Sequence, residues 1–307
     1  MRRAGVDVVC AGILVADVIA RPVDDLPARG SLGFVAAIEL RGGGSALNTA
    51  TALRRLGLEV AVAGKVGTDA FGDFLLGVID ERGLESRVVR DAAVPTSATV
   101  ALVGADGERT FLHVPGANGA LRAEEIDFAG ARALHVAGAL VMPALDGEPT
   151  AQLLARARAA GMTTSLDTVF DPTGGWERVL SALPHVDVFA PGLAEARGIT
   201  GETEPAQAVE RLRRVVDWTC VTLGADGCWS DGHVPGLSVD AVDGTGAGDA
   251  FSAGLLYGRL AGWDFERSVR FANAAGALAT TAVGAAEGLR DLGETLALAS
   301  DRGEPAA

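Results

Sequence analysis

The sequence predicts an α/β fold in which helices cover both faces of a mostly parallel central sheet, with a small β-sheet lid inserted into it. Short apolar runs rich in β-branched residues alternate with amphipathic helical stretches along most of the 307 residues, which is typical of βα units. Two segments, 15–40 and 96–114, break this alternation and predict strands and turns. A glycine-rich turn also leads directly into a helix near residue 246, which is an arrangement that can bind phosphate.

The first half of the chain supplies two buried strands and two helices. Residues 6–14 and 60–63 are apolar runs that predict the strands. Residues 48–56 follow three glycines and predict a helix that ends at Gly57. Apolar side chains between Phe71 and Ile79 then recur on one helical face, and Gly83 ends this second helix.

The lid is predicted from the two segments that interrupt this rhythm. Residues 96–103 and 109–114 are strand-like, and the turn at 104–107 joins them as a hairpin. Prolines and glycines punctuate residues 15–40, so no helix is expected there. We therefore expect 15–40 and 96–114 to form the lid, and 1–14, 41–95 and 115–300 to form the body. Residues 301–307 predict a disordered tail.

The second half returns to the alternation of strands and helices. Core strands are predicted at 133–137, 163–166, 186–190 and 219–223. Helical stretches such as 151–160 and 206–216 lie between them. This order argues for a parallel sheet that is covered on both faces.

Composition excludes several classes of protein. The formal net charge of −14 argues against a nucleic-acid partner. The single lysine, Lys65, is followed by Val66, so the chain has no P-loop of the G-x-x-x-x-G-K-[ST] type. Cys10, Cys220 and Cys228 lack the spacing of metal ligands and predict buried, reduced thiols. With no secretory leader and no long apolar stretch, we expect a cytoplasmic protein without a membrane partner.

The run from Val242 to Phe251 carries the clearest chemical signal. Amide groups in the first turn of a helix lack internal partners and lie at the positive end of its dipole, and glycines let a phosphate approach them. Asp249 falls in this first turn, where its carboxylate can take a proton from a hydroxyl group that attacks phosphorus. The pairing predicts phosphoryl transfer. Taken alone, the run also fits an ordinary tight turn with a helix-capping charge.

Residues 243–249 resemble the C-terminal signature of the ribokinase-like (PfkB) carbohydrate kinase family. The family's other signature is similar to residues 43–50, and the segments 64–72 and 270–276 resemble it further, in the family's order. The resemblance covers residues 6–290. It implies a ribokinase-like three-layer α/β/α fold with a lid, and ATP-dependent phosphorylation of a sugar hydroxyl group.

The resemblance also implies roles for particular residues. Asp249 would be the catalytic base, and the amides of Gly246, Ala247 and Gly248 would stabilise the transferred phosphoryl group. The sugar contacts would be Asp17, Gly43, Gly44 and Asn48. The ATP contacts would be Thr222, Gly224 and Asn273. Glu195 would organise Mg²⁺, and Asp243 and Thr245 would adjoin a K⁺ ion.

One departure from the family pattern concerns the metal. The family carries an Asn-x-x-Glu motif, and here Gly192 stands where the asparagine is expected, although Glu195 is retained. Water can replace the missing amide oxygen at some cost in Mg²⁺ affinity. The alternative is a catalytically weak homologue that binds sugar or regulates.

The substrate is expected to be a neutral sugar, with a nucleoside as the alternative. Val15 replaces the asparagine found in ribokinases, which argues against ribose. Asp171 stands where kinases of acidic sugars carry an arginine, which argues against an acidic substrate. No cluster of Lys or Arg adjoins the Gly43 signature, which argues against a phosphorylated sugar. Since such lids pair two subunits in many relatives, and an exposed sheet edge favours pairing, we expect a homodimer.

Overall fold

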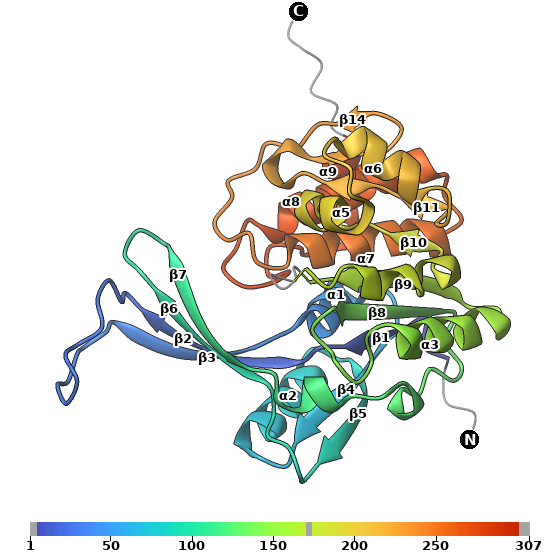
Figure 1. Ribbon diagram of the computed structural model, residues 1–307. Coiled ribbons are helices and arrows are strands. Elements are labelled where there is room, and N and C mark those ends of the chain that lie inside the picture. Colours follow the sequence, from blue (N-terminus) through green and yellow to red (C-terminus); the bar gives the residue numbers. More distant parts are fainter. Residues whose placement is uncertain (1–4, 170–173, 301–307) are drawn as a thin grey trace, which may run out of the picture.

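The computed structural model describes residues 5–169 and 174–300, and it shows a layered body from which a narrow arm of strands projects (Figure 1). The predicted tail at 301–307 and the substrate argument on Asp171 lie outside the described residues. No helix in the described part of the chain combines the length and apolar character needed to span a membrane.

A parallel sheet of seven strands forms the middle layer of the described body. Its strands are β1 (Val8–Gly12), β4 (Val60–Gly67), β5 (Glu85–Asp91), β8 (Ala133–Ala139), β9 (Thr163–Thr168), β10 (Val188–Phe189) and β11 (Trp218–Thr219). Their order is β11-β10-β9-β8-β1-β4-β5, and every pair is parallel. Every residue of β1, β4 and β8 is buried, as expected for strands that are covered on both faces. The predicted fold class is confirmed.

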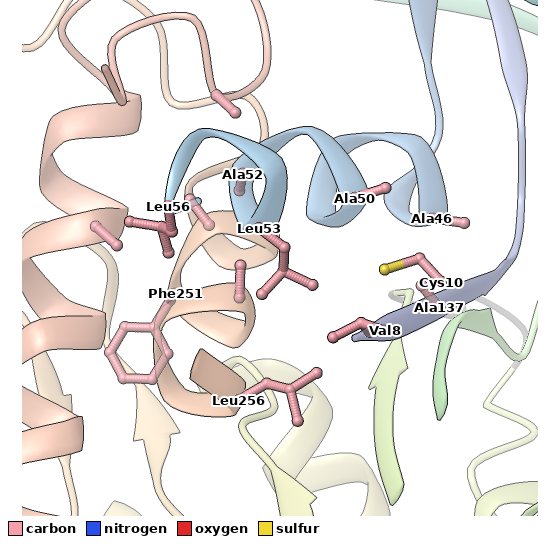
Figure 2. Packing of buried hydrophobic residues seen from close by; sticks show 14 of the residues in the cluster. Val8, Cys10, Ala46, Ala50, Ala52, Leu53, Leu56, Ala137, Phe251 and Leu256 are labelled. Carbon is pink, nitrogen blue, oxygen red and sulfur yellow. The ribbon is translucent and has the colours of Figure 1, made fainter. Parts of the chain in front are cut away.

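Helices cover the two faces of this sheet. The helices are α1 (Ser45–Arg55), α2 (Ala70–Glu81), α3 (Glu148–Ala159), α4 (Glu177–Leu180), α5 (Leu193–Thr200), α6 (Pro205–Leu212), α7 (Ala247–Leu260), α8 (Phe265–Ala279) and α9 (Leu292–Ser300). On one face, Val8 of β1 packs against Leu53 of α1 and Leu256 of α7 in a single apolar cluster (Figure 2). On the other face, Val9 belongs to the cluster that contains Leu153 of α3. The packing brings the starts of α1 and α7 to one end of the sheet.

The arm is a separate sheet of four strands. They are β2 (Val15–Arg21), β3 (Ala37–Gly43), β6 (Ala98–Val103) and β7 (Arg109–Val114), in the order β3-β2-β6-β7. The hairpin of β6 and β7 was predicted, and β2 pairs with β6 in parallel. Cross-strand partners share a face, so Asp17 and Thr99 lie on one side and Val18 and Val100 on the other.

The base of the arm is tied to the body by buried polar groups. The side-chain amide of Asn118 both donates to the carbonyl oxygen of Leu14 and accepts from its amide, at 3.0 Å each. Asp69 caps α2 by accepting from Gly72, and its other oxygen accepts from the amide of Thr96. The glycine-rich turn at 64–72 is therefore a structural junction between β4, α2 and the arm.

Several predicted boundaries are wrong. The expected strand at 219–223 is two strands, because Val221 and Thr222 (β12) leave the central sheet and pair with β13 (Cys228–Trp229). With β14 (His233–Val234) they form a small third sheet that was not predicted. The half-buried edge strand β5 was missed as well. Strand β10 has only two residues, and β3 continues to Gly43, beyond the predicted end of the lid segment at 40.

Candidate functional site

The start of α7 leaves backbone amides free. Gly246 caps the helix in the left-handed region, with φ 74°, and a Cβ atom there would lie 2.6 Å from that of Ala285. Within the described residues, the amides of Gly246 and Gly248 have no hydrogen-bond acceptor, whereas Ala247 donates weakly to Gly244 at 3.3 Å. A Cβ atom on Gly248 would meet nothing within 4 Å. The turn therefore presents amides to open space, as an anion site requires.

Asp249 meets α1 at the centre of the candidate site. Its Oδ2 accepts a hydrogen bond of 2.8 Å from Nδ2 of Asn48. Burial raises the pKa of Asp249 to about 7, against hydrogen bonds from Asn48 and Ser45 that lower it, and the charge of Glu195 raises it further. The Oδ1 atom of Asn48 is buried and has no partner among the described residues, so it is free to accept from a ligand hydroxyl group.

The predicted sugar contacts lie beside this pair. Asp17, Gly43, Gly44 and Asn48 all line a cavity of about 880 Å³ between the arm and the body. The carboxylate of Asp17 passes so close to Gly43 that a Cβ atom there would overlap its Oδ2. Burial raises the pKa of Asp17 to about 6, with a hydrogen bond from Thr99 opposing the shift. Asp17 and the segment 43–48, which lie apart in the sequence, thus converge.

Two further carboxylates lie near Asp249. Asp167, which the sequence argument did not select, stands near the carboxyl end of β9, where α/β proteins place ligand-binding groups. Burial raises its pKa well above the usual range, and the charges of Asp249 and Glu195 add to this. Burial also raises the pKa of Glu195. Such a donor set fits Mg²⁺, which binds carboxylates and retains water. Among the described residues no three such groups lie close enough to enclose a metal directly, so water would complete the shell.

Gly192 occupies the start of α5. Its amide donates to Oε2 of Glu195 at 2.7 Å, so that Glu195 caps its own helix. The backbone is extended, with φ −66°, and a Cβ atom would lie 3.5 Å from Oε2 of Glu195 and 3.9 Å from the hydroxyl of Thr222. Both are ordinary contacts, so the position has room for a side chain.

Asp243 and Thr245 are joined to the arm. Arg109 on β7 donates to Oδ1 of Asp243 and to Oγ1 of Thr245, at 2.7 Å each. Burial opposes ionisation of Asp243, but bonds from Arg109, Thr245 and the amide of Gly284 hold its pKa well below the usual range. Nothing in the sequence pattern linked Arg109 to this loop, because 134 residues separate it from Asp243.

The expectation that no cluster of Lys or Arg adjoins the glycine signature is wrong, because folding brings arginines from distant segments next to Gly43. Arginines at six positions line the cavity: Arg21, Arg41, Arg54, Arg55, Arg82 and Arg109. Each has a partner within the protein. Glu39 binds Arg21 and Arg41, Glu59 binds Arg54, and Glu287 lies between Arg55 and Arg82. The cavity is therefore lined by basic residues whose charges are paired with acidic residues of the same chain.

The predicted nucleotide contacts lie away from this cavity. Thr222 ends β12 and forms a β-bridge with Gly192, which places it next to the start of α5. Gly224 follows in a short turn with φ 64°. Asn273 is buried on α8, and its Nδ2 donates to the carbonyl oxygen of Pro235 at 2.7 Å. Its amino group therefore holds the chain near Pro235 in place.

The chain is similar to known sugar kinases over most of its length. The profile of the pfkB family carbohydrate kinases matches residues 6–292. The chain is 31% identical over 254 residues to an uncharacterized sugar kinase of Archaeoglobus fulgidus, an alignment that covers 77% of this chain and 97% of that protein. It is 33% identical over 290 residues to an ATP-dependent ribose-1-phosphate kinase of Halopiger xanaduensis, with 91% of this chain and 94% of that protein covered.

Solved structures share the fold. A fructokinase from Xylella fastidiosa with bound ATP superposes with a TM-score of 0.79 at 27% identity, over 95% of this chain and 97% of that one. A putative ribokinase II from E. coli, in complex with ATP and Mg²⁺, gives a TM-score of 0.80 at 23% identity, over 95% of this chain and 98% of that one.

Proposed function

Because the chain belongs to the pfkB family of carbohydrate kinases, we propose that its site transfers the γ-phosphoryl group of ATP to a hydroxyl group of a neutral sugar. The observation that carries the assignment is the contact between Asp249 and Asn48 beside the free amides at the start of α7. On this proposal, the contact brings together a base (Asp249), a sugar-binding amide (Asn48) and an anion site.

The proposed step needs little more than positioning and charge. Asp17 and Asn48 orient the sugar, since each offers oxygen atoms to its hydroxyl groups. The oxygen of the sugar hydroxyl group bonds to the γ-phosphorus as the bond between that phosphorus and the ADP oxygen breaks. Asp249 takes the proton of the hydroxyl group in the same step. With a pKa of about 7, Asp249 is a better base than an ordinary carboxylate. The amides of Gly246, Ala247 and Gly248 would stabilise the charge on the transferred group.

The nucleotide is proposed to lie on the α5 and α8 side of this centre. Thr222 and Gly224 would contact ATP, whereas Asn273 would act by ordering the chain at Pro235. Glu195 and Asp167 would hold Mg²⁺ through water, and the ion would neutralise phosphate charge. A K⁺ ion beside Asp243 and Thr245 stays a prediction; turnover in potassium should then exceed turnover in tetramethylammonium at equal ionic strength.

Because the arginines of the cavity are already in ion pairs, a neutral acceptor fits the site better than a phosphorylated one. A sugar phosphate would have to displace an acid or a carbonyl oxygen from at least one of them, and separating a partly buried ion pair costs free energy. The relative named as a ribose-1-phosphate kinase makes the competing assignment concrete. Sugar phosphates and nucleosides therefore belong in the acceptor panel.

The arm of β2, β3, β6 and β7, which contains the predicted lid segments 15–40 and 96–114, is proposed to serve as a lid and as the contact between two subunits. Apolar side chains are exposed on its outer face: Ile38, Val100, Leu112 and Val114. A second copy of the sheet would cover them. Sedimentation at micromolar concentration should give a dimer, and Leu112→Lys should give a monomer; a monomeric wild-type protein would contradict the proposal. Reduced cysteines and the use of ATP suit a cytoplasmic enzyme.

ADP release with a panel of neutral sugars, polyols, nucleosides and sugar phosphates tests the assignment. We expect turnover with a neutral sugar, and Asp249→Asn should lower kcat by about 100-fold or more, the scale of losing a general base. Asp80→Asn, a change at an exposed carboxylate on α2, is the control and should leave kcat unchanged. No turnover with any acceptor, or full turnover by Asp249→Asn, would exclude the proposed mechanism and favour a sugar-binding homologue.

A further inference from the structure

Two arginines of the arm reach across to two separate loops of the body. Arg41 on β3 donates from Nη1 to the carbonyl oxygen of Val283 at 3.0 Å, and Arg109 on β7 binds Asp243 and Thr245. Strands β3 and β7 are the two outer strands of the lid sheet. The lid is therefore fastened to the body at both of its edges.

The contact of Arg109 is a closed ring of hydrogen bonds. The hydroxyl of Thr245 donates its proton to Oδ1 of Asp243 and accepts from Nη1 of Arg109, while Nη2 binds the same Oδ1 atom. The side chain of Asp243 is only 8% exposed and that of Arg109 38% exposed. A planar guanidinium can contact both oxygens at once, whereas an ammonium is a point charge without that fork. The second oxygen of Asp243 accepts from the amide of Gly284 at 3.0 Å, which joins the two body loops.

This ring lies next to the amides of the anion site. Thr245 precedes Gly246 directly, and Gly246 is packed against Ala285, two residues beyond the Val283 carbonyl that Arg41 holds. The position of Gly246 is thus fixed from one side by the loop that Arg109 binds and from the other by the loop that Arg41 binds. No other lid side chain is needed to connect lid position with the start of α7.

We propose that Arg109 is a positioning residue, supported by Arg41, which aligns the phosphate-binding amides at Gly246 only while the lid lies over the sugar. Phosphoryl transfer to water would be disfavoured, because an open lid would leave the amide site misaligned. The inference rests on the kinase activity but assigns Arg109 no contact with the substrate. A change in the position of catalytic groups by about 1 Å can cost about 100-fold in rate.

The test is a set of changes at Arg109 in the full-length protein, with sugar, ATP and Mg²⁺ present. Arg109→Met should lower kcat by about 10- to 100-fold while the KM for sugar changes less than about 3-fold, because positioning is lost and sugar contacts remain. Arg109→Lys should have a kcat between those of wild type and Arg109→Met, since it keeps the positive charge but cannot bind two oxygens at once. Arg214→Met is the matched control and should behave as wild type, because Arg214 lies in the turn after α6 and pairs with Glu210 on the surface.

A second measurement separates positioning from a general loss of fold. Arg109→Ala should regain part of its kcat on addition of guanidinium at low millimolar concentration, and the control should not respond. An unchanged kcat in Arg109→Met would overturn the proposal. So would a loss confined to the KM for sugar, which would make Arg109 a substrate contact, or full activity in Arg109→Lys. If wild-type protein turns over no acceptor, the kinase assignment fails before this question arises.

Discussion

Two glycines at the start of α7 offer a test in which stability and activity should separate. Gly248 lies within the helix, and a methyl group there would meet nothing within 4 Å. Because Ala loses less backbone entropy than Gly in a helix, Gly248→Ala should raise the free energy of unfolding by about 0.5–1 kcal/mol. That corresponds to a rise in Tm of about 1–3 °C. The same methyl group would project from the turn that we propose binds phosphate, so kcat should fall by about 10-fold or more.

Gly246→Ala should behave differently, although it lies two residues away. Its φ of 74° is left-handed, which costs an alanine about 1–2 kcal/mol. The new Cβ atom would also lie 2.6 Å from that of Ala285, and overpacking of this kind costs about 1–3 kcal/mol. The sum is a destabilisation of about 2–5 kcal/mol, or a fall in Tm of about 4–10 °C.

Thermal unfolding by circular dichroism and steady-state ADP release, measured on the same preparations, check both variants. The expected pattern is a stable but slow Gly248→Ala and an unstable Gly246→Ala. If Gly248→Ala keeps wild-type kcat, the amides at this turn do not hold the transferred phosphate and the reasoning is refuted. If Gly246→Ala is as stable as wild type, the packing of the turn against Ala285 is not as described.

Three further changes test other parts of the site. Gly192→Asn should lower the Mg²⁺ concentration needed for half-maximal turnover, because an asparagine could supply the amide oxygen that the family motif provides. Its Tm should shift by less than about 2 °C, since the backbone is extended and there is room beside Glu195. An unchanged Mg²⁺ titration would contradict this. Burial raises the pKa of Asp17 to about 6 and that of Asp249 to about 7, and both act ionised, so kcat/KM for sugar should rise with pH through about 6 to 7; Asp17→Asn should leave the single limb of Asp249 near 7. Asn118→Ala should destabilise the protein by about 2–4 kcal/mol in denaturant unfolding, since both backbone groups of Leu14 lose a buried partner; a loss below about 1 kcal/mol would show that water replaces them.

The local parts of the site could be predicted because the interactions that build them are local. The glycine spacing at 244–248 and the place of Asp249 in the first turn follow from a few consecutive residues and the geometry of a helix start. The lid hairpin at 98–114 follows from alternating residues around a turn. The pattern of the central strands likewise identified most of the sheet, since strands buried on both faces are continuously apolar.

Apolar runs, however, do not specify which element a strand pairs with. Residues 219–223 form one run of apolar and β-branched residues, but Val221 pairs with Trp229 in another sheet. A run that belongs to one sheet has the same pattern as a run that two sheets share. The edge strand β5 was missed because only one of its faces is well covered and its residues are mostly polar.

The sequence by itself determined the fold class, the glycine-rich turn at the start of α7 and the carboxylate in its first turn, because helix starts, glycine conformations and apolar periodicity are properties of neighbouring residues. Only the tertiary structure decided the partners of that carboxylate: Asn48, 201 residues away, and Glu195, whose charge adds to the rise in its pKa that burial causes. It also decided that the arginines lining the cavity are already paired, and that Arg109 joins the arm to the loop at 243–245. Such contacts depend on how separate elements pack, and no spacing along the chain encodes the distance between them.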